Sequence, residues 1–466
     1  MAKKIDEEGA THADLAGREV LNRTDGRFFI TAACAGAEVK TSFLDSLQTI
    51  KKSTRGQIRI LPMRSHAQPL QAQNPVYDSV LTPYIEKGFT ASQVVFNSNL
   101  MAMDLQLNPQ MTNPLTGLKK IGRSSIILAH PVSAMTTIAN SNRGLPRTIH
   151  TTGVCTLPDY QINRAGLMAK QAHQIGGLSV ELDGSAFHIR ELFSDKNGSI
   201  VDLGRRYMPN GESAFEEALS VVLGDIHAGQ HDEQAMSAWE KLIKLVKPKF
   251  IVLHDLFNGQ SINPHMYKNM FAQLGRNKYN DNLENELATT KRLLTRICNW
   301  LPSAKIIIVP SNHNDWIDRY LTQGYWVQDT VNYATAYRLV GHILNGHSAL
   351  QKEIDPNGKC VWLKRNEDLW LAGIQHSCHF DLGPNGAKAG PDNLEATYGY
   401  ATGGHVHSPY TLRGIMAVGT SSLLRMGYND GPSGWLHSSI VTHASQSKNC
   451  VGLRQRITLI DGRFRA

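Results

Sequence analysis

An aspartate and a histidine two residues apart, Asp225 and His227, directly follow the apolar run 221–223 and a glycine. Short apolar runs of this kind predict a buried strand, so both side chains would stand at its carboxyl end. A carboxylate oxygen and a neutral imidazole nitrogen are ligands that suit Zn²⁺, Mn²⁺ and Fe. Asp-x-His occurs by chance in many chains, and the pair gains its weight from three later stretches.

Those later stretches also carry metal-ligand residue types at expected strand ends. The residues concerned are Asp255 after the run 250–253, Asn312 and His313 after the run 305–309, and His405 and His407 in a glycine-rich block preceded by His376 and His379. Ligands in open α/β sheets collect beyond the carboxyl ends of the strands. Four such ends therefore predict a two-metal site at one edge of a sheet.

The order of these blocks resembles that of the calcineurin-like metallophosphoesterase superfamily, which reads Asp-x-His, Gly-Asp-x-x-Asp, Gly-Asn-His-Asp/Glu, a single His and Gly-His-x-His. The resemblance covers about 225 through 420 and keeps every metal-binding residue type in order. It departs at His254, Asn258 and Ser311, where the superfamily has Gly, Asp and Gly. These departures leave the ligands in place, although Asn258 puts in doubt a carboxylate that could orient one of them.

The resemblance implies two divalent metal ions, Mn²⁺ first, with Mg²⁺, Zn²⁺ or Fe as alternatives. By motif, the ligands are Asp225, His227 and His407 for one ion, Asn312, His405 and His379 (alternatively His376) for the other, and Asp255 for both. A hydroxide between the two metals would attack phosphorus in line. His313 would be the general acid, or would stabilise the charge that develops on the leaving oxygen.

A narrower resemblance rests on the glycine-containing stretches 383–386, 403–409 and 431–435. They are similar to those of phage-encoded metallophosphoesterase DNases, such as the early host-DNA-degrading nucleases of T5-like bacteriophages. This implies a Mn- or Mg-dependent hydrolase of DNA phosphodiester bonds, with DNA as its partner and a homo-oligomeric state.

In this interpretation three residues near the C-terminus line the substrate groove: Arg425, Tyr428 and Trp435. The aromatic rings would stack on bases and the guanidinium would meet phosphate. An alternative for Trp435, equally open, is burial beneath a glycine-rich turn.

Two other functions stay open: a phosphomonoesterase or small-molecule phosphodiesterase with the same metals, and a non-catalytic scaffold. The net charge of +8, the pI near 9.1 and the large N-terminal half favour a polyanionic substrate. Retention of Asp255 and His313 argues against a scaffold.

The composition indicates a soluble globular protein, with 41% hydrophobic and 19% charged residues. No apolar stretch reaches the roughly 18 residues of a membrane span, and the first residues lack the apolar core of a secretory signal. We expect a cytoplasmic protein, in the host cytoplasm if it is phage-encoded. The six cysteines show no Cys-x-x-Cys spacing, which indicates reduced thiols.

The chain as a whole predicts an α/β fold. The N-terminus, 1–24, is expected to be flexible or helical. An N-terminal α/β domain follows over 25–215, with a βαβ unit at 28–62, an irregular part at 62–125 and a hairpin at 177–192.

Residues 216–466 would form the metallophosphoesterase domain, an αββα-type sandwich by resemblance. Helices are predicted at 232–247 and 281–299. The segment 414–419 and a closing pair of antiparallel strands at 436–443 and 451–460 are expected, by the resemblance, to belong to the second sheet. Histidines outside the blocks, such as His130, are predicted to be structural.

Overall fold

A computed structural model describes most of the chain. The described residues are 19–20, 25–64, 76–85, 93–97, 99–103, 105, 107–120, 124–140, 144–263, 282–426, 429–447 and 450–466. The predicted flexible or helical N-terminus lies outside them, except for Glu19–Val20, which forms strand β1 beside β4 (Gln93–Asn97).

A six-stranded sheet carries the first three predicted ligand blocks. Its order is β17-β16-β15-β14-β23-β24, and the bounds are Val361–Trp362, Lys305–Ile308, Phe250–Leu253, Ser220–Leu223, Ser438–His443 and Leu453–Thr458. Strands β14 to β17 run parallel, because helical crossovers connect most of them. The closing pair β23 and β24 is antiparallel, as predicted, but it joins this sheet beside β14 and not the second sheet.

Side chains of the parallel strands alternate between two cores. Val221 and Leu223 pack with helices α3 (Glu233–Val246) and α5 (Leu283–Trp300) on one face. Val222 packs on the other face against Met416 and Val418 of the second sheet. A strand with both faces buried needs a continuous apolar run, which is why the sequence shows one here.

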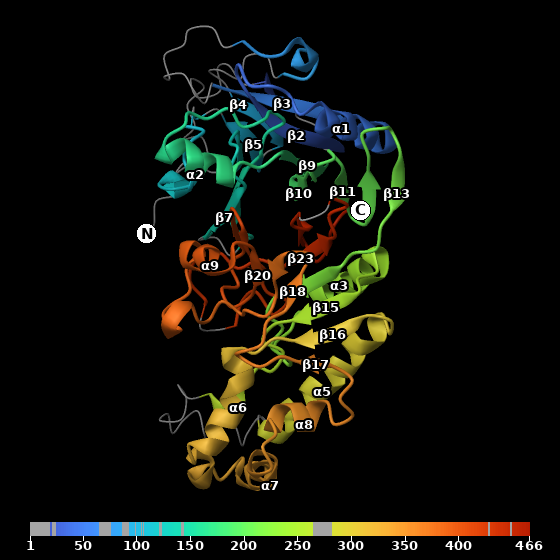
Figure 1. Cartoon of the computed structure of the whole chain (residues 1–466). Helices are drawn as coiled ribbons and strands as arrows, with labels where there is room; N and C mark the ends of the chain where they lie inside the picture. The colour runs from blue at the N-terminus through green and yellow to red at the C-terminus, as the bar shows by residue number, and fades with distance from the viewer. Residues whose placement is uncertain are drawn as a thin grey trace, which may run out of the picture.

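Three further helices lie beyond β16 and β17, at the bottom of the molecule in Figure 1. They are α6 (Asn312–Thr322), α7 (Tyr333–Leu344) and α8 (Ala349–Ile354). The helices predicted at 232–247 and 281–299 are confirmed as α3 and α5.

The second sheet is part of an eleven-stranded sheet with the order β1-β4-β5-β6-β8-β7-β21-β22-β20-β19-β18. Its C-terminal members are β18 (Trp370–Leu371), β19 (Ile374–Gln375), β20 (Ala401–Gly403), β21 (Tyr410–Leu412) and β22 (Ile415–Ala417). Leu394 of α9 (Pro391–Tyr398) packs on its outer face with Ala401 and Ile415. Helix, sheet, sheet and helix therefore lie in four layers, and the predicted α/β class is confirmed.

The N-terminal half contains the predicted βαβ unit and hairpin. The unit is β2 (Asp25–Cys34), α1 (Thr41–Thr54) and β3 (Gln57–Met63), with parallel strands. The hairpin is β9 (Gly176–Asp183) with β10 (Ala186–Phe193), and β9 pairs with β2 to give the order β10-β9-β2-β3.

The remaining N-terminal elements were only partly predicted. Short helices occur in the irregular part, but so do β4 and β5 (Leu100–Met103), which the sequence did not indicate. The other elements are β6 (Ser125–Leu128), β7 (Ala134–Ile138), β8 (Arg147–Thr151), α2 (Arg164–Ala172), β11 (Ile200–Asp202), β12 (Arg205–Tyr207) and β13 (Ser213–Phe215).

The boundary predicted at residues 215 and 216 does not separate the sheets. Strand β7 pairs antiparallel with β21, so one sheet continues from the N-terminal half into the C-terminal half. Buried polar contacts cross the same boundary: Gln455 donates to Asp202 (2.9 Å), and the backbone N–H of Arg456 donates to Glu191 (2.9 Å). The division into two domains stays a prediction.

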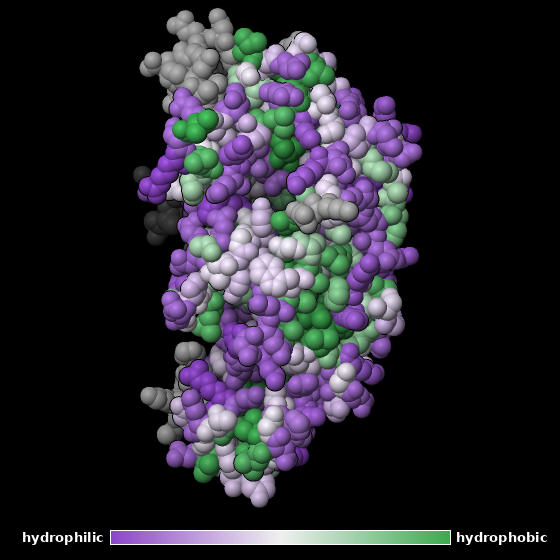
Figure 2. Space-filling model, viewed as in Figure 1, coloured by the Kyte–Doolittle hydropathy of each residue, from purple (hydrophilic) through white to green (hydrophobic). Residues whose placement is uncertain are grey.

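The visible face of the molecule is mostly hydrophilic, with a hydrophobic patch in its middle, over the region of β15 and β16 (Figure 2). Among the described residues, no helix combines the length and the apolar character that a membrane crossing requires.

Candidate metal centre

The predicted ligands come together where five strands of two sheets end. Strands β14, β15 and β16 of the six-stranded sheet lead into the loops with Asp225, Asp255 and Asn312. Strands β19 and β20 of the facing sheet lead into the loops with His379 and His407. Two sheets packed face to face bring these loops to one edge, as the position of ligand types after strands predicts.

The first cluster consists of Asp225, His227 and His407, all buried. His407 Nε2 lies 2.9 Å from Asp225 Oδ2 and 3.2 Å from His227 Nε2. Two imidazole nitrogens that face each other beside a carboxylate are poorly satisfied by one another. They are arranged as donors around a shared cation would be.

Asp255 connects this cluster to His379. Its Oδ2 lies 3.1 Å from His379 Nε2 and 3.9 Å from His227 Nε2, and its buried Oδ1 has no hydrogen-bond partner among the described residues. Three groups of ligand atoms close enough to hold a metal ion result: Asp225 with His227 and His407, His227 with Asp255 and His313, and Asp225 with Asp255 and His379.

Asn312 and His313 lie in the first turn of α6. Ser311, where the resembled superfamily has glycine, is the N-cap residue and accepts from the backbone N–H of Asn314 (3.3 Å). The buried Oδ1 of Asn312 has no partner among the residues that the structure describes. The cap thus fixes where the helix begins, with His313 in one ligand group together with His227 and Asp255, and Asn312 directly before it.

The ring of His313 is held from three sides. Its Nδ1 is 2.7 Å from the backbone carbonyl of Asn258, so Nδ1–H donates there and Nε2 is left facing the cluster. Trp316 packs on the ring with centroids 3.9 Å apart, and His227 meets it edge-on at 4.5 Å. A backbone carbonyl therefore orients His313, and the replacement of an aspartate by Asn258 does not affect this contact.

Four predicted ligands have the left-handed backbone conformation that residues with a Cβ seldom adopt. The φ angles are 51° at His227, 40° at Asp255, 73° at His405 and 49° at His407. Such conformations cost about 1–3 kcal/mol each and collect at functional sites. The fold holds these side chains in one place at some cost in stability.

A close approach of the backbone explains the glycine before His405. A Cβ on Gly404 would lie 2.3 Å from Asp225 Oδ1 and 3.0 Å from the Cβ of His254. The backbone N–H of His405 donates to the same Asp225 oxygen (3.1 Å). The glycine therefore lets this turn bind the carboxylate directly.

The charges of the cluster favour a cation. Burial would raise the pKa of Asp225, but the imidazoles of His379 and His407 lower it overall. Burial likewise opposes ionisation of Asp255, and His379 and His313 lower the pKa of that carboxyl well below its usual value. For His379, burial lowers the pKa, but the carboxylates of Asp255 and Asp225 raise it to about 9. Two buried carboxylates that both stay ionised are stable only with positive charge close to them.

Two other histidines predicted as ligands, or as an alternative ligand, belong to none of the three groups. His405 lies beside His379, with ring centroids 5.3 Å apart, but its side chain is exposed and belongs to none of the three groups. His376, the alternative to His379, also joins no group, and both its ring nitrogens are buried without a hydrogen-bond partner among the described residues. Of the two histidines, His379 is therefore the one placed against the carboxylates.

Of the three residues predicted to contact the substrate, only Trp435 lies against a residue of the cluster among those that the structure describes. Trp435 is half-buried and meets the ring of His407 edge-on, with centroids 4.1 Å apart. The Arg425 guanidinium donates to the backbone carbonyl of Asn429 (2.9 Å) and to that of Gly431 (2.5 Å), and so holds its own loop together. Tyr428 lies outside the described residues.

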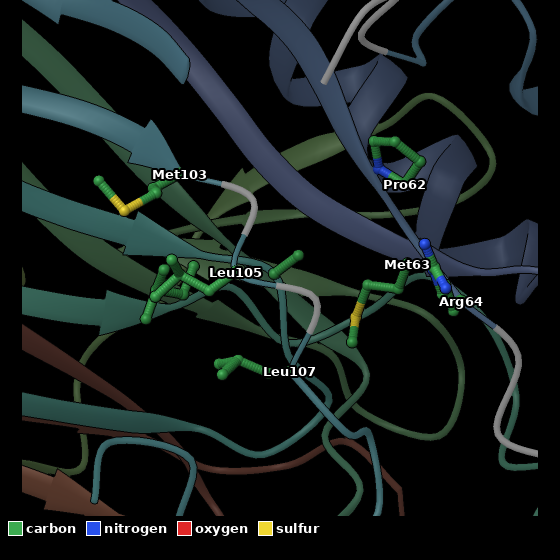
Figure 3. Close-up of a pocket in the computed structure, with 8 residues that line it drawn as sticks. Pro62, Met63, Arg64, Met103, Leu105 and Leu107 are labelled. Atoms are coloured by element: carbon green, nitrogen blue, oxygen red, sulfur yellow. The ribbon is translucent and has the colours of Figure 1, made fainter. Parts of the chain in front are cut away.

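One small pocket and the thiol of Cys378 take no part in the three ligand groups. A small pocket at the ends of β3, β5 and β6, where Met63 and Leu105 lie across from each other (Figure 3), has a volume of about 10 Å³. It would hold at most one water molecule. Burial raises the pKa of the Cys378 thiol, which keeps it neutral, as expected of a structural cysteine.

Sequence reasoning missed two contributors, His254 and Trp316. His254 was noted only as a departure from a motif, although its Nδ1 lies 3.2 Å from His379 Nδ1. Trp316 stands three residues after His313 on α6, and residues so spaced share a helix face. That spacing was the available signal.

A comparison with known proteins finds Protein A1 of Escherichia phage T5, which is 27% identical to this chain over 417 residues, or 83% of this chain and 73% of that protein. No protein-family model matches the chain, and no solved structure matches it. The chain is thus distantly related to a phage protein over most of its length.

Proposed function

We propose that this protein is a di-metal-dependent phosphodiesterase of the metallophosphoesterase type that hydrolyses DNA. The observation that carries the proposal is the buried arrangement of Asp225 and Asp255, each of which belongs to two of the three groups of potential metal ligands. A carboxylate shared between ligand groups is what two neighbouring cations require. The relationship to a phage protein supports a phage setting, in which the substrate would be host DNA.

By motif, the residues divide into two cation sites that share Asp255, and Asp225 also takes part in two of the three ligand groups. Asp225, His227 and His407 would hold one ion, Asn312, His379 and His405 the other, and Asp255 both. Oxygen and imidazole donors suit Mn²⁺ first, with Mg²⁺, Zn²⁺ or Fe as alternatives. Two divalent cations, when bound, polarise phosphoryl oxygens and make water a better nucleophile at neutral pH.

His313 supplies the proton. Since Nδ1–H is committed to the Asn258 carbonyl, Nε2 is the atom that faces the reacting groups. Protonated at Nε2, the ring can donate to the oxygen that leaves phosphorus, which is the task of a general acid. The rings of Trp316 and His227 pack against the His313 ring and so fix the direction in which Nε2 points.

A polymeric anion is the substrate that the charge of the chain favours. The net charge of the chain is +8. A positive net charge attracts a polyanion such as nucleic acid. Trp435 beside His407 offers an aromatic ring next to the cluster on which a base can stack. A homo-oligomer remains part of the proposal, as implied by the resemblance to phage DNases.

The test is hydrolysis of plasmid DNA, bis-p-nitrophenyl phosphate and p-nitrophenyl phosphate with Mn²⁺, with Mg²⁺ and with EDTA. The variant is Asp255→Asn, and the matched control is Asp461→Asn, an exposed carboxylate after β24. We expect metal-dependent cleavage of DNA and of the diester, lost in Asp255→Asn and kept in the control. Hydrolysis of the monoester alone would contradict the proposal in favour of a phosphatase. Inactivity on all three substrates would contradict it too.

A further inference from the structure

His254 forms a buried contact with His379 that the ligand blocks do not explain. The two Nδ1 atoms are 3.2 Å apart, and the ring planes are within 23° of parallel. Both side chains are buried, so water cannot take over this hydrogen bond. The contact sits directly behind the histidine that faces Asp255.

The direction of this hydrogen bond follows from the other side of the His379 ring. His379 Nε2 lies 3.1 Å from Asp255 Oδ2, whereas Nδ1 is 3.9 Å from Asp225 Oδ1 and closer, at 3.2 Å, to His254 Nδ1. A histidine that presents Nε2 to a cation carries its proton on Nδ1 and donates it to an outer partner. His254 Nδ1 is the atom at that position, so we assign it as the acceptor, which puts the proton of His254 on Nε2, a buried nitrogen with no partner among the described residues.

The backbone and its packing fix the acceptor in place. The carbonyl of His254 accepts from the backbone N–H of Ile226 (3.2 Å), which ties the β15 loop to the β14 loop. Gly404 covers the other side, since a Cβ there would come within 3.0 Å of the Cβ and Cγ of His254. The His254 ring is therefore fixed by its own surroundings and can orient the His379 ring.

We propose that His254 is a positioning residue that orients His379 and thereby sets the affinity of the cation site to which His379 belongs. The inference rests on the proposed function, because it concerns a ligand of that same site. His254 touches neither substrate nor cation in this account. Glycine, which the resembled superfamily has at this position, could not supply the contact.

Two near-isosteric variants test this, His254→Asn and His254→Leu. The asparagine Oδ1 is attached to Cγ as the histidine Nδ1 is, so it keeps an acceptor at that place, whereas leucine has a similar size and no acceptor. Mn²⁺ is titrated into the full-length protein after treatment with EDTA, and binding is followed by calorimetry and by the electron spin resonance of free Mn²⁺. Urea unfolding in EDTA shows whether both variants fold.

We expect the wild type to bind two Mn²⁺ ions, and one of them to bind about 10–100-fold more weakly in His254→Leu. In His254→Asn both affinities should stay within about threefold of the wild type, because the acceptor is retained. Equal affinities in the wild type and His254→Leu would overturn the inference while leaving the proposed function intact. Equal losses in the two variants would also overturn it, because the ring and not its acceptor would then matter. A wild type that binds no Mn²⁺ would overturn the proposed function itself, and this inference with it.

Discussion

Replacing Gly404 by alanine should damage the metal centre through one added methyl group. The new Cβ would lie 2.3 Å from Asp225 Oδ1, roughly 1 Å closer than the ~3.5 Å at which non-bonded atoms normally meet. The carboxylate cannot simply retreat, because the His405 N–H and the ring of His407 hold its two oxygens. Either Asp225 or the turn that carries both histidines must move by about that distance.

The expected size of the effect follows from this displacement. A misplacement of about 1 Å at a reacting centre can cost on the order of 100-fold in rate, and overpacking costs about 1–3 kcal/mol of stability. Gly404→Ala should therefore hydrolyse bis-p-nitrophenyl phosphate about 100-fold more slowly and bind Mn²⁺ more weakly. Gly431→Ala is the matched control, since a Cβ there meets nothing within 4 Å.

The assay compares the two variants with the wild type by turnover of the diester and by Mn²⁺ titration, with thermal unfolding in EDTA as the measure of folding. A Gly404→Ala protein with wild-type Mn²⁺ affinity and turnover would refute the reasoning. It would mean that Asp225 is not held where a ligand must be.

Three more outcomes follow from individual contacts. His313→Ala should lower turnover by about 10²–10⁴-fold at unchanged Mn²⁺ content, whereas a loss of Mn²⁺ would make His313 a ligand. Trp435→Ala should weaken binding of single-stranded DNA by about 1–3 kcal/mol and Trp435→Phe by less, with metal content unchanged; equal affinity in a filter-binding assay would end the stacking interpretation. Burial lowers the pKa of His130 from 6.5 to about 4, so its neutral form contributes stability that is complete above about pH 6.5 and is lost as the pH falls toward 4. In urea unfolding with EDTA, His130→Asn should therefore lose about 2 kcal/mol less than the wild type between pH 7 and pH 5, and equal losses would show that His130 is not held neutral.

The grouping of the candidate metal ligands could be predicted from the sequence because these residues directly follow buried strands. Asp225 and Asp255 come right after apolar runs that have to lie side by side in a parallel sheet. Once that is known, their proximity is a matter of sheet geometry. The choice between His376 and His379 could not be made in this way, because both follow the two-residue strand β19 and only tertiary packing turns one of them toward Asp255.

The arrangement of the sheets could be predicted less well from the sequence, because it too depends on tertiary packing. The pairing of Met135 with Thr411, which makes one sheet of strands from both halves, joins residues that share no local pattern. Strand β4 contains Val94, Val95 and Phe96, which favour a strand, but the polar residues on both sides limit this signal to three positions. The closing pair was predicted to be antiparallel, but nothing within two such strands tells which of two stacked sheets they will extend.

The hydrogen bonds that orient His313 and His379 were beyond sequence reasoning. One partner is the backbone carbonyl of Asn258 and the other is the ring of His254. A backbone acceptor has no residue-type signature at all. From the sequence, His254 beside Asp255 could be interpreted only as a further ligand or as a departure from a motif. Its contact with the His379 ring becomes evident in the structure.

The most direct test of the account is the number of Mn²⁺ ions bound per chain. The full-length protein is stripped with EDTA, reloaded with Mn²⁺, freed of excess metal and measured by elemental analysis against protein concentration, for the wild type and for Asp255→Asn. We expect two ions per wild-type chain and weaker binding of both in the variant, because Asp255 is shared. A wild type that retains no Mn²⁺, or an Asp255→Asn protein that still binds two ions as tightly, would contradict it.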